Sequence, residues 1–248
     1  MALYGLIGKT LRHSFSQKYF SEKFERHNLK DHKYELFELE SISEINSLKK
    51  NPDLKGFNVT IPYKEEVLSH LKSVEVNAKR IGAVNVIKIV DNQLHGYNTD
   101  YFGFRESLKK WLADKSGNLS ALVLGTGGAS KAVVAALDSL GIKNILISRI
   151  RSNQAISYDD LTQRVIQDNK LIVNTTPLGM LPDLESKPKL PYEFITSEHW
   201  IYDLVYNPKE TLFLKLGKQQ GAQIKNGLEM LFLQAEKSWE IWQSKSDL

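Results

Sequence analysis

Residues 120–130, Ser-Ala-Leu-Val-Leu-Gly-Thr-Gly-Gly-Ala-Ser, contain the pattern that decides the fold. The apolar run Ser120–Leu124 predicts a buried strand, and the apolar periodicity of residues 130–140 predicts a helix that Gly141 ends. Further elements predicted after it are strands over 144–148, 170–174, 200–205 and 222–225, and a helix over 211–220. This alternation is typical of a doubly wound α/β domain with a parallel sheet.

The turn between the first strand and helix of this block is rich in glycine. Gly125 permits a tight turn, and Gly127 lets the backbone approach a pyrophosphate that the helix N-terminus would hold. The last position of the fingerprint is Ser130 instead of glycine, and a plain strand-to-helix turn is the less favoured alternative. The residues predicted to bind a dinucleotide here are Gly125, Thr126, Gly127, Gly128 and Ala129.

The next strand ends at Ser148-Arg149-Ile150-Arg151, which contains no acidic residue. A domain that binds NAD usually has Asp or Glu at this point to bond the ribose hydroxyls. Guanidinium groups match a phosphate dianion, so Ser148, Arg149 and Arg151 predict NADP (NADPH) as the cofactor. The alternative is that both arginines are solvated loop residues. The polar segment 151–157 is too short for a usual crossover helix, which indicates an abbreviated adenosine end of the site.

A second loop, Asn174–Met180, follows another predicted strand. Doubly wound sheets bind ligands at the carboxyl ends of their strands, so Thr175 in this loop is a further candidate cofactor residue. A purely structural loop explains the pattern equally well.

The first hundred residues also alternate strands and helices. The predicted elements are strands over 3–8, 33–39, 56–60, 83–90 and 93–97, a helix that Ser16 would cap, and a helical segment over 41–49 with a Ser41–Glu44 capping box. The last two strands form a hairpin turned at Asp91-Asn92, so this sheet is mixed. The predicted fold is therefore α/β, with an N-terminal α/β substrate domain, a doubly wound Rossmann-like NADP domain, and a cleft between them.

The boundary between these domains is predicted at the amphipathic helix over 100–112. We place the substrate-binding and catalytic domain at residues 1–100 and the dinucleotide-binding domain at residues 101–225. The final helix, predicted over 228–242, would return within residues 226–248 to complete the first domain.

Lys64, in the segment Gly56–Glu66, is the strongest candidate for chemistry. An apolar strand there runs into Pro62, which suits the first position of a helix. Lys64 would then lie in the first turn, where the helix dipole disfavours a cation and so favours proton exchange near neutral pH. The alternative, which holds for most lysines, is a solvated surface residue.

Asp100 also begins a predicted helix after a strand. If the two strands are neighbours, Lys64 and Asp100 point into one cleft as a proton donor and the partner that orients it. Neutral hydrogen bonds to a polyhydroxylated substrate would come from Ser14, Ser16, Asn58, Thr60 and Asn85. Helix capping is the alternative role for the serines, and a satisfied polar group in a strand is the alternative for Asn85.

Composition excludes several kinds of site. The chain has no cysteine, and its six histidines lack the paired spacing of a zinc site, so we expect no metal. The net charge of +4 comes without a dense basic block, so we expect no nucleic-acid partner. No apolar run is long enough for a membrane span. We expect a cytoplasmic monomer or homodimer that acts on a small-molecule substrate.

Together these motifs resemble the shikimate dehydrogenase family, which includes quinate/shikimate dehydrogenases. The segments that carry the resemblance are His13–Ser16, Asn58–Glu66, Gly82–Asn85, Asn98–Asp100, Gly125–Ser130, Asn174–Met180, Asp203–Pro208 and Asn226–Gln234. The resemblance covers nearly the whole chain. It implies NADPH-dependent reduction of 3-dehydroshikimate to shikimate, a step towards chorismate and the aromatic amino acids.

The resemblance also implies residue roles. Lys64 would be the catalytic acid/base, and Asp100 would hydrogen-bond to the substrate and to the lysine. Ser14 and Ser16 would hold the substrate carboxylate. The other implied contacts are Thr60, Asn85 and Gln234 to the substrate hydroxyls, Tyr206 near them, and Leu204 and Gly227 beside the nicotinamide.

Three features depart from the family pattern. Gln17 stands where a proline is common, Ser148-Arg149-Ile150 stands where Asn-Arg-Thr is usual, and the crossover that follows is shortened. The last two concern how NADP is held and leave the Lys64 and Asp100 chemistry unchanged.

Other functions stay open from the sequence. A short-chain dehydrogenase needs Tyr and Lys four residues apart after the glycine-rich turn, whereas Tyr19 and Lys23 lie well before it. A quinate/shikimate dehydrogenase of mixed NAD and NADP use would differ in only a few side chains. A non-catalytic ligand-sensing homologue would not need both Lys64 and Asp100.

Overall fold

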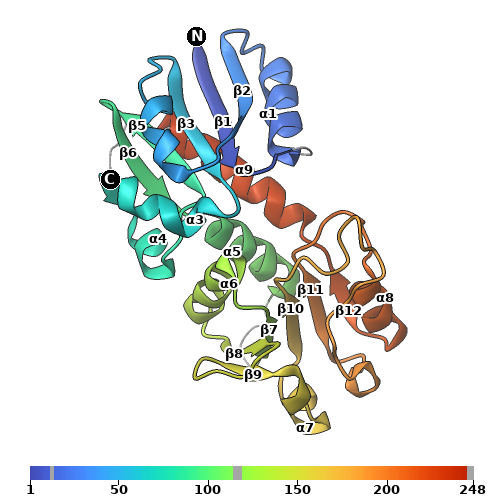
Figure 1. Ribbon diagram of the computed structural model, residues 1–248. Coiled ribbons are helices and arrows are strands. Elements are labelled where there is room, and N and C mark those ends of the chain that lie inside the picture. The colour runs from blue at the N-terminus through green and yellow to red at the C-terminus, as the bar shows by residue number, and fades with distance from the viewer. Residues whose placement is uncertain (12–13, 114–118, 245–248) are drawn as a thin grey trace. The chain divides into compact units, whose positions relative to one another are not determined.

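The computed structural model describes residues 1–11, 14–113 and 119–244 (Figure 1). His13, which begins one of the motifs above, lies outside these residues. The chain forms two compact units, the first from Met1–Thr99 with Ala235–Leu248 and the second from Asp100–Gln234. The unit boundaries fall within helices α5 (Thr99–Leu112) and α9 (Leu228–Gln243). Each unit contains one six-stranded sheet.

The sheet of the first unit is mixed, as predicted. Its strands are β1 (Ala2–Gly8), β2 (His32–Glu38), β3 (Leu54–Val59), β4 (Ser73–Val74), β5 (Val86–Val90) and β6 (Gln93–Tyr97), in the order β2-β1-β3-β5-β6-β4. β1 pairs in parallel with β2 and β3, whereas β5 is antiparallel to β3 and β6. Asp91 and Asn92, with φ of 49° and 59°, form the hairpin turn, because a tight hairpin turn of this kind needs positive φ at both central residues.

Helices cover both faces of this sheet. They are α1 (Phe15–Arg26), α2 (Ile45–Leu48), α3 (Tyr63–Glu66) and α4 (Val76–Ile81), with 3₁₀ turns at Ile42–Glu44 and Val67–His70. Because strand side chains alternate, Leu3 and Ile7 pack into a core with residues of α2, α3 and α4. Tyr4 and Leu6 point to the other face and pack with residues of α1 and α9.

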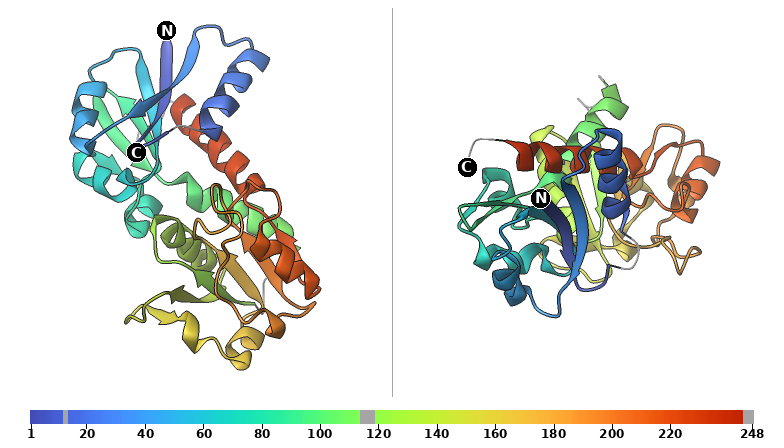
Figure 2. Two further views of the ribbon diagram at one scale, coloured as in Figure 1. Left: turned by 45° about the vertical axis from the view of Figure 1, so that its right-hand side comes forward. Right: turned by 90° about the horizontal axis from the view of Figure 1, so that it is seen from above.

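The sheet of the second unit is parallel throughout. Its strands are β7 (Ser120–Leu124), β8 (Lys143–Ser148), β9 (Ala155–Ser157), β10 (Leu171–Asn174), β11 (Trp200–Asp203) and β12 (Gln223–Lys225), in the order β12-β11-β10-β7-β8-β9. The helices that follow its strands are α6 (Gly128–Ser139), α7 (Gln163–Asp168) and α8 (Leu212–Gln219), with 3₁₀ turns at Tyr158–Asp160 and Tyr192–Phe194. Figure 2 shows this unit from two further directions.

Alternating side chains of the parallel sheet enter two separate cores. Val123 and Val173 pack with α5, α6 and Met230 of α9 on one face. Leu122 and Ile172 pack with α7, α8 and the segment around Leu190 on the other. A parallel sheet covered on both faces is the doubly wound arrangement that the sequence predicts, so the predicted fold class is confirmed.

Several local predictions need correction. Ser14, not Ser16, is the N-cap of α1, and α6 begins at Gly128 instead of Ser130. α3 is a single turn that Pro62 precedes, so the dipole that a longer helix would direct at Lys64 is weak. The sequence missed the short elements β4, α4, β9 and α7. The link from β8 to β9 contains no helix, as the short polar segment indicates.

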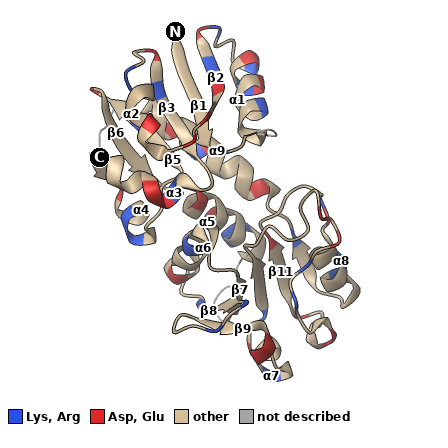
Figure 3. Ribbon diagram, viewed as in Figure 1, with Lys and Arg blue, Asp and Glu red and all other residues tan. Residues whose placement is uncertain are grey.

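Charged side chains bear on possible partners. Lys, Arg and Glu are interspersed along α1, so this helix presents no surface of one sign (Figure 3). Among the described residues, no group of three His, Cys, Asp or Glu side chains is placed to hold a metal ion. Of the helices that the structure describes, none has both the length and the apolar character that crossing a membrane requires.

Candidate active site

The predicted substrate residues Asn58 and Asn85 belong to a network of neutral hydrogen bonds in the first unit. Asn58 accepts a bond from the Tyr34 hydroxyl at 2.8 Å and donates one to Ser238 Oγ at 3.1 Å. Asn85 accepts from the Thr99 N–H at 2.7 Å and donates to Thr99 Oγ1 at 3.1 Å. Thr99 Oγ1 and Ser238 Oγ lie 3.2 Å apart and join the two halves. All these side chains are buried, so the network is satisfied within the protein.

Lys64 belongs to the first unit, and Asp100 is the first residue of the second. The Lys64 carbonyl accepts a hydrogen bond from the Val84 N–H at 2.8 Å. The next residue, Asn85, binds the N–H of Thr99, and Asp100 follows Thr99 in the first turn of α5. Lys64 and Asp100 are both half-buried. The proton-transfer pair that the sequence predicts for these two residues remains a prediction.

Ser14, Ser16 and Thr60 have separate local environments. Ser14 Oγ accepts a hydrogen bond from the Gln17 N–H at 3.2 Å, so the capping role foreseen as an alternative for the serines holds for Ser14. A proline at position 17 has no N–H and would remove this bond. The Ser16 hydroxyl bonds to Tyr34. Thr60 follows β3 directly and is half-buried.

A pocket of about 680 Å³ lies at the carboxyl ends of β7, β8, β9 and β10 in the second unit. The predicted cofactor residues that line it are Gly125, Thr126, Gly127, Ser148, Arg149 and Thr175. Parallel strands end on the same edge of a sheet, and this edge is where doubly wound folds bind ligands.

The backbone geometry of the turn accounts for its glycines. Gly125 has φ of +110°, and a Cβ there would come within 2.8 Å of Thr175 Oγ1. Gly127 is the N-cap of α6 and has no capping side chain, and a Cβ on it would meet no atom within 4 Å. The N-terminus of α6 therefore has free space and unbonded N–H groups for an anion. Ser130 replaces the third glycine, and its Oγ donates to Gly127 O at 2.6 Å.

Not every predicted cofactor residue joins this pocket. Arg151 is largely exposed and pairs with Asp160, with 3.6 Å between Nη1 and Oδ1. Gly128 and Ala129 form the first turn of α6 and do not line the pocket. Charged and polar lining residues that the sequence did not indicate are Ser157, Tyr158, Asp159, Thr176, Lys187 and Lys189. Two local signals were available for part of this set: the Ser157–Asp160 capping box and the position of Thr176 in the Asn174–Met180 loop.

Asp203, at the end of β11, fixes the loops after two neighbouring strands. Its carboxylate accepts hydrogen bonds from Asn174 Nδ2 at 2.9 Å and from Thr211 Oγ1 at 2.6 Å. It also accepts one from the Val205 N–H at 3.0 Å. Burial raises the pKa of Asp203 to about 6, although these three bonds oppose the rise. The loops that carry Thr175 and Leu204 are therefore held by one buried carboxylate.

Leu204 and Gly227, predicted to border the nicotinamide, lie together. The Gly227 N–H donates to Val205 O at 3.2 Å, and a Cβ on Gly227 would overlap the Leu204 carbonyl. Tyr206 is half-buried, and burial raises its pKa. Gln234 is buried, and its Nε2 donates to Leu231 O at 3.0 Å.

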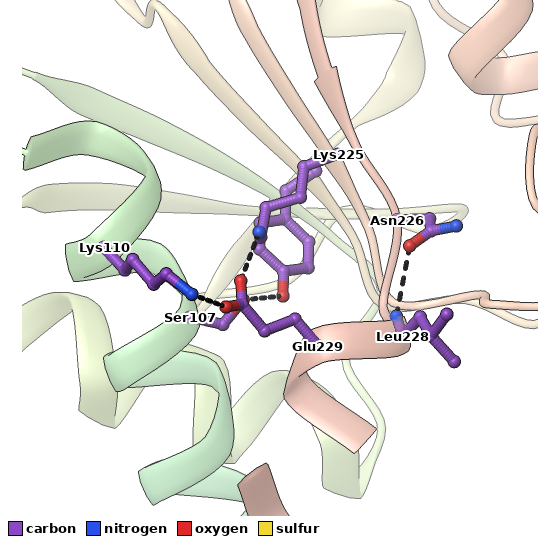
Figure 4. A network of polar contacts seen from close by, with 7 residues as sticks. Ser107, Lys110, Lys225, Asn226, Leu228 and Glu229 are labelled. Atoms are coloured by element: carbon purple, nitrogen blue, oxygen red, sulfur yellow. Dashed lines mark hydrogen bonds and ion pairs between the residues drawn. The ribbon is translucent and has the colours of Figure 1, made fainter. Parts of the chain in front are cut away.

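Glu229 forms a charged network in the same unit (Figure 4). Lys110 Nζ and Lys225 Nζ donate to its carboxylate at 2.7 and 2.6 Å, and Ser107 Oγ donates at 3.2 Å. Burial raises the pKa of Glu229, but the bonds and charges of the two lysines outweigh it and lower the pKa to about 2. This network ties α5, β12 and α9 together and lies outside the cofactor pocket.

Tyr19 and Lys23, which have the spacing of a short-chain dehydrogenase pair, have a structural partner. The Tyr19 hydroxyl and Lys23 Nζ both donate to the Glu236 carboxylate, and the lysine bonds measure 2.8 and 2.6 Å. Burial lowers the pKa of Lys23. These residues join α1 to α9 within the first unit.

Comparisons with known proteins agree with this architecture. The model of the shikimate dehydrogenase substrate binding domain matches residues 6–87. The shikimate dehydrogenase (NADP(+)) of Clostridium beijerinckii is 41% identical over 256 residues, which cover 98% of this chain and 92% of the relative. The chain belongs to the shikimate dehydrogenase family.

Solved structures of this family have the same fold. Shikimate 5-dehydrogenase from Thermus thermophilus, in complex with NADP(H) and shikimate, superposes with a TM-score of 0.86 at 32% identity, covering 98% of this chain and 94% of that one. Shikimate dehydrogenase 1 from Peptoclostridium difficile gives a TM-score of 0.83 at 39% identity, covering 100% and 94%. Both solved structures therefore share the fold over nearly the whole of this chain.

Proposed function

We propose that this chain is an NADP-dependent shikimate dehydrogenase, which reversibly reduces 3-dehydroshikimate to shikimate in the biosynthesis of chorismate and the aromatic amino acids. The observation that carries this proposal is the 41% identity to a shikimate dehydrogenase (NADP(+)) over 98% of the chain. We assign substrate binding and catalysis to residues 1–100 with 226–248, and dinucleotide binding to residues 101–225.

The pocket of the second unit fits NADP. Gly125 and Gly127 keep side chains away from the N-terminus of α6, where a pyrophosphate would bind. Arg149, at the end of β8, would bind the phosphate on the adenosine ribose, and Leu204 with Gly227 would border the nicotinamide. When bound, NADPH supplies the hydride that reduces the carbonyl carbon.

Lys64, in the first unit, would supply the proton, and the residues that the sequence predicts would hold the substrate. Lys64 gives a proton to the carbonyl oxygen of 3-dehydroshikimate and takes it back in the reverse direction, and Asp100 orients the ammonium group and bonds the substrate. Ser14 and Ser16 hold the carboxylate. Thr60, Asn85 and Gln234 bind the hydroxyls of the substrate. Asn58 and Tyr206 lie near them in this proposal. The Asn58 and Asn85 side chains are held in place by their bonds to Tyr34, Ser238 and Thr99.

A turnover assay tests the proposal directly. The purified chain is mixed with shikimate and NADP⁺, and formation of NADPH is followed by its absorbance. We expect turnover that depends on both reactants. Binding of NADP⁺ without turnover would favour the non-catalytic ligand sensor instead.

Two further arms separate the close alternatives. Quinate replaces shikimate in one arm, and NAD⁺ replaces NADP⁺ in the other. We expect shikimate with NADP⁺ to be the best pair, and equal or better rates with quinate and NAD⁺ would favour a quinate/shikimate dehydrogenase. A cytoplasmic location and a monomeric or homodimeric state are part of the same proposal.

A further inference from the structure

Three basic side chains line the cofactor pocket, although the sequence near β8 indicates only arginines. Arg149 follows β8, whereas Lys187 and Lys189 come from the segment between β10 and β11. Lys187 and Lys189 are exposed, and Pro188 and Leu190 beside them are buried. The alternation anchors the segment through Leu190 in the core and leaves both ammonium groups on the side of the pocket.

An ion pair locates Lys189 within this pocket. Its Nζ lies 2.8 Å from Oδ1 of Asp159, which follows β9. β9 pairs directly with β8, with Ser157 opposite Ser148, so Lys189 lies one strand away from Arg149. Adenosine ribose in doubly wound domains binds at the end of the second strand, which is β8 here. Lys189 is therefore near the place where a ribose phosphate would lie.

Among the described residues that line the pocket, Asp159 is the acidic one. A carboxylate near the ribose usually favours NAD, because it accepts bonds from the ribose hydroxyls and repels a phosphate. Lys189 compensates the charge of Asp159, while Arg149 and Lys187 form no ion pair with any described residue. The pocket therefore keeps a surplus of positive charge despite its acid.

We propose that Lys187 and Lys189 select NADP over NAD together with Arg149, and that Lys189 also neutralises Asp159. Arg151, the other predicted phosphate ligand near β8, pairs with Asp160 and does not line the pocket, so the two lysines add the positive charge that Arg151 does not supply there. This inference rests on the proposed use of NADP. It assigns cofactor choice to a segment that is distant in sequence from the glycine-rich turn.

Two adenosine compounds test the inference without catalysis. Adenosine 2′,5′-bisphosphate and adenosine 5′-monophosphate differ only in the 2′-phosphate, and calorimetry measures their affinities. We expect Lys187→Ala and Lys189→Ala each to weaken binding of the bisphosphate by about tenfold to 150-fold, the range for one charged hydrogen bond, and to leave binding of the monophosphate unchanged. Lys218→Ala is the control, because Lys218 is an exposed, ion-paired lysine on α8 outside the pocket.

Three results would overturn the inference. They are an unchanged affinity for the bisphosphate, an equal loss for both compounds, or the same loss in the Lys218→Ala control. Thermal unfolding of each variant shows whether it is folded, and both lysines are exposed, so we expect unchanged melting.

A double variant isolates the role of Asp159. Lys189→Ala should lower the ratio of kcat/KM for NADP⁺ to that for NAD⁺, because the bare carboxylate repels the phosphate. Adding Asp159→Asn should recover most of that ratio, and no recovery would contradict the neutralising role. If the wild-type chain binds the bisphosphate but never oxidises shikimate, the proposed function fails while this inference stands. If it oxidises shikimate and the lysine variants keep the NADP preference, the inference alone fails.

Discussion

Two of the polar networks of this protein, one in each unit, differ in charge. The network around Asn58 and Asn85 is neutral, buried and joined by amides and hydroxyls. The network around Glu229 is ionic and includes a largely exposed lysine, Lys110. Neutral bonds hold their strength at every pH, whereas an ion pair depends on protonation. The stability that the Asn58 and Asn85 network provides should therefore be insensitive to pH, whereas the stability that the Glu229 network provides should not.

The largest expected effect comes from Lys64, the titratable group beside the neutral network. Lys64→Ala should lower kcat by about a hundredfold to ten-thousandfold, which is the usual contribution of a positioned acid or base. Shikimate affinity should change little, because the neutral network remains. Steady-state kinetics measure kcat, and equilibrium titration measures shikimate binding. A variant with near wild-type kcat would remove Lys64 from the chemistry.

Asn85→Ala tests the neutral network itself. The substitution removes the amide that bonds the buried N–H and hydroxyl of Thr99, so we expect a loss of about 2 kcal/mol in the free energy of unfolding. The loss should be the same at pH 5 and pH 8, measured by urea denaturation. Asn46→Ala, at an exposed asparagine of α2, is the control and should cost little. A loss that changes with pH would contradict the comparison.

Glu229→Gln tests the ionic network. The pKa of Glu229 falls from 4.5 to about 2 on folding, so the ionised form stabilises the protein fully above pH 4.5. This stabilisation is lost as the pH falls from 4.5 towards 2. Because solvent screens this partly exposed group, we expect the variant to lose only about 2 kcal/mol at pH 7. The loss should shrink below pH 4.5, since the wild type itself loses the ion pairs there. Urea unfolding across this range is the measurement.

A matched control is available at Glu210, which precedes α8. Glu210→Gln removes an exposed carboxylate that Lys218 meets at 3.1 Å, and exposed pairs contribute little. Its unfolding should match that of the wild type from pH 7 to pH 2. A Glu229→Gln variant that behaves like Glu210→Gln would show that the ionic network does not stabilise the second unit.

The sequence predicted those parts of the fold that local chemistry determines. The hairpin at Asp91 and Asn92 follows from two residues that tolerate positive φ, and β7 follows from an apolar run before glycine. The missed elements β4 and β9 have only two and three residues, and pairing with neighbouring strands creates them. Their existence depends on tertiary contacts, which no local pattern encodes.

The candidate site divides in the same way. The glycine-rich turn and Arg149 were predicted because each lies within a recognisable segment, and both line the pocket. Lys187 and Lys189 were missed because they reach the pocket from a segment anchored by Leu190. Ser238 was missed as well, although it shares the buried face of α9 with Ala235 and Trp242 at helical spacing. A serine on such an apolar face was a usable signal for a buried hydrogen bond.

The smallest expected effect on stability comes from His199, a buried side chain of the second unit. Nδ1 accepts a bond from the Thr196 N–H at 2.9 Å, so Nε2 carries the proton and donates to Ile166 O at 3.1 Å. Burial lowers the pKa of His199 from 6.5, and the Ile166 carbonyl only partly opposes this. As the pH falls through 6.5, His199 therefore binds a proton more readily in the unfolded chain than in the folded one. Stability from this group is complete above pH 6.5 and is lost as the pH falls through the lowered pKa.

Unfolding between pH 7.5 and 5.5 measures this contribution. The wild type should lose at most about 1.4 kcal/mol per pH unit from one histidine, and His199→Gln should flatten the slope by the same amount. His27→Gln, at an exposed position after α1, should keep the wild-type slope. If His199→Gln keeps that slope too, His199 does not set the pH dependence of the second unit in this range, and Asp203, whose pKa burial raises to about 6, becomes the group to test.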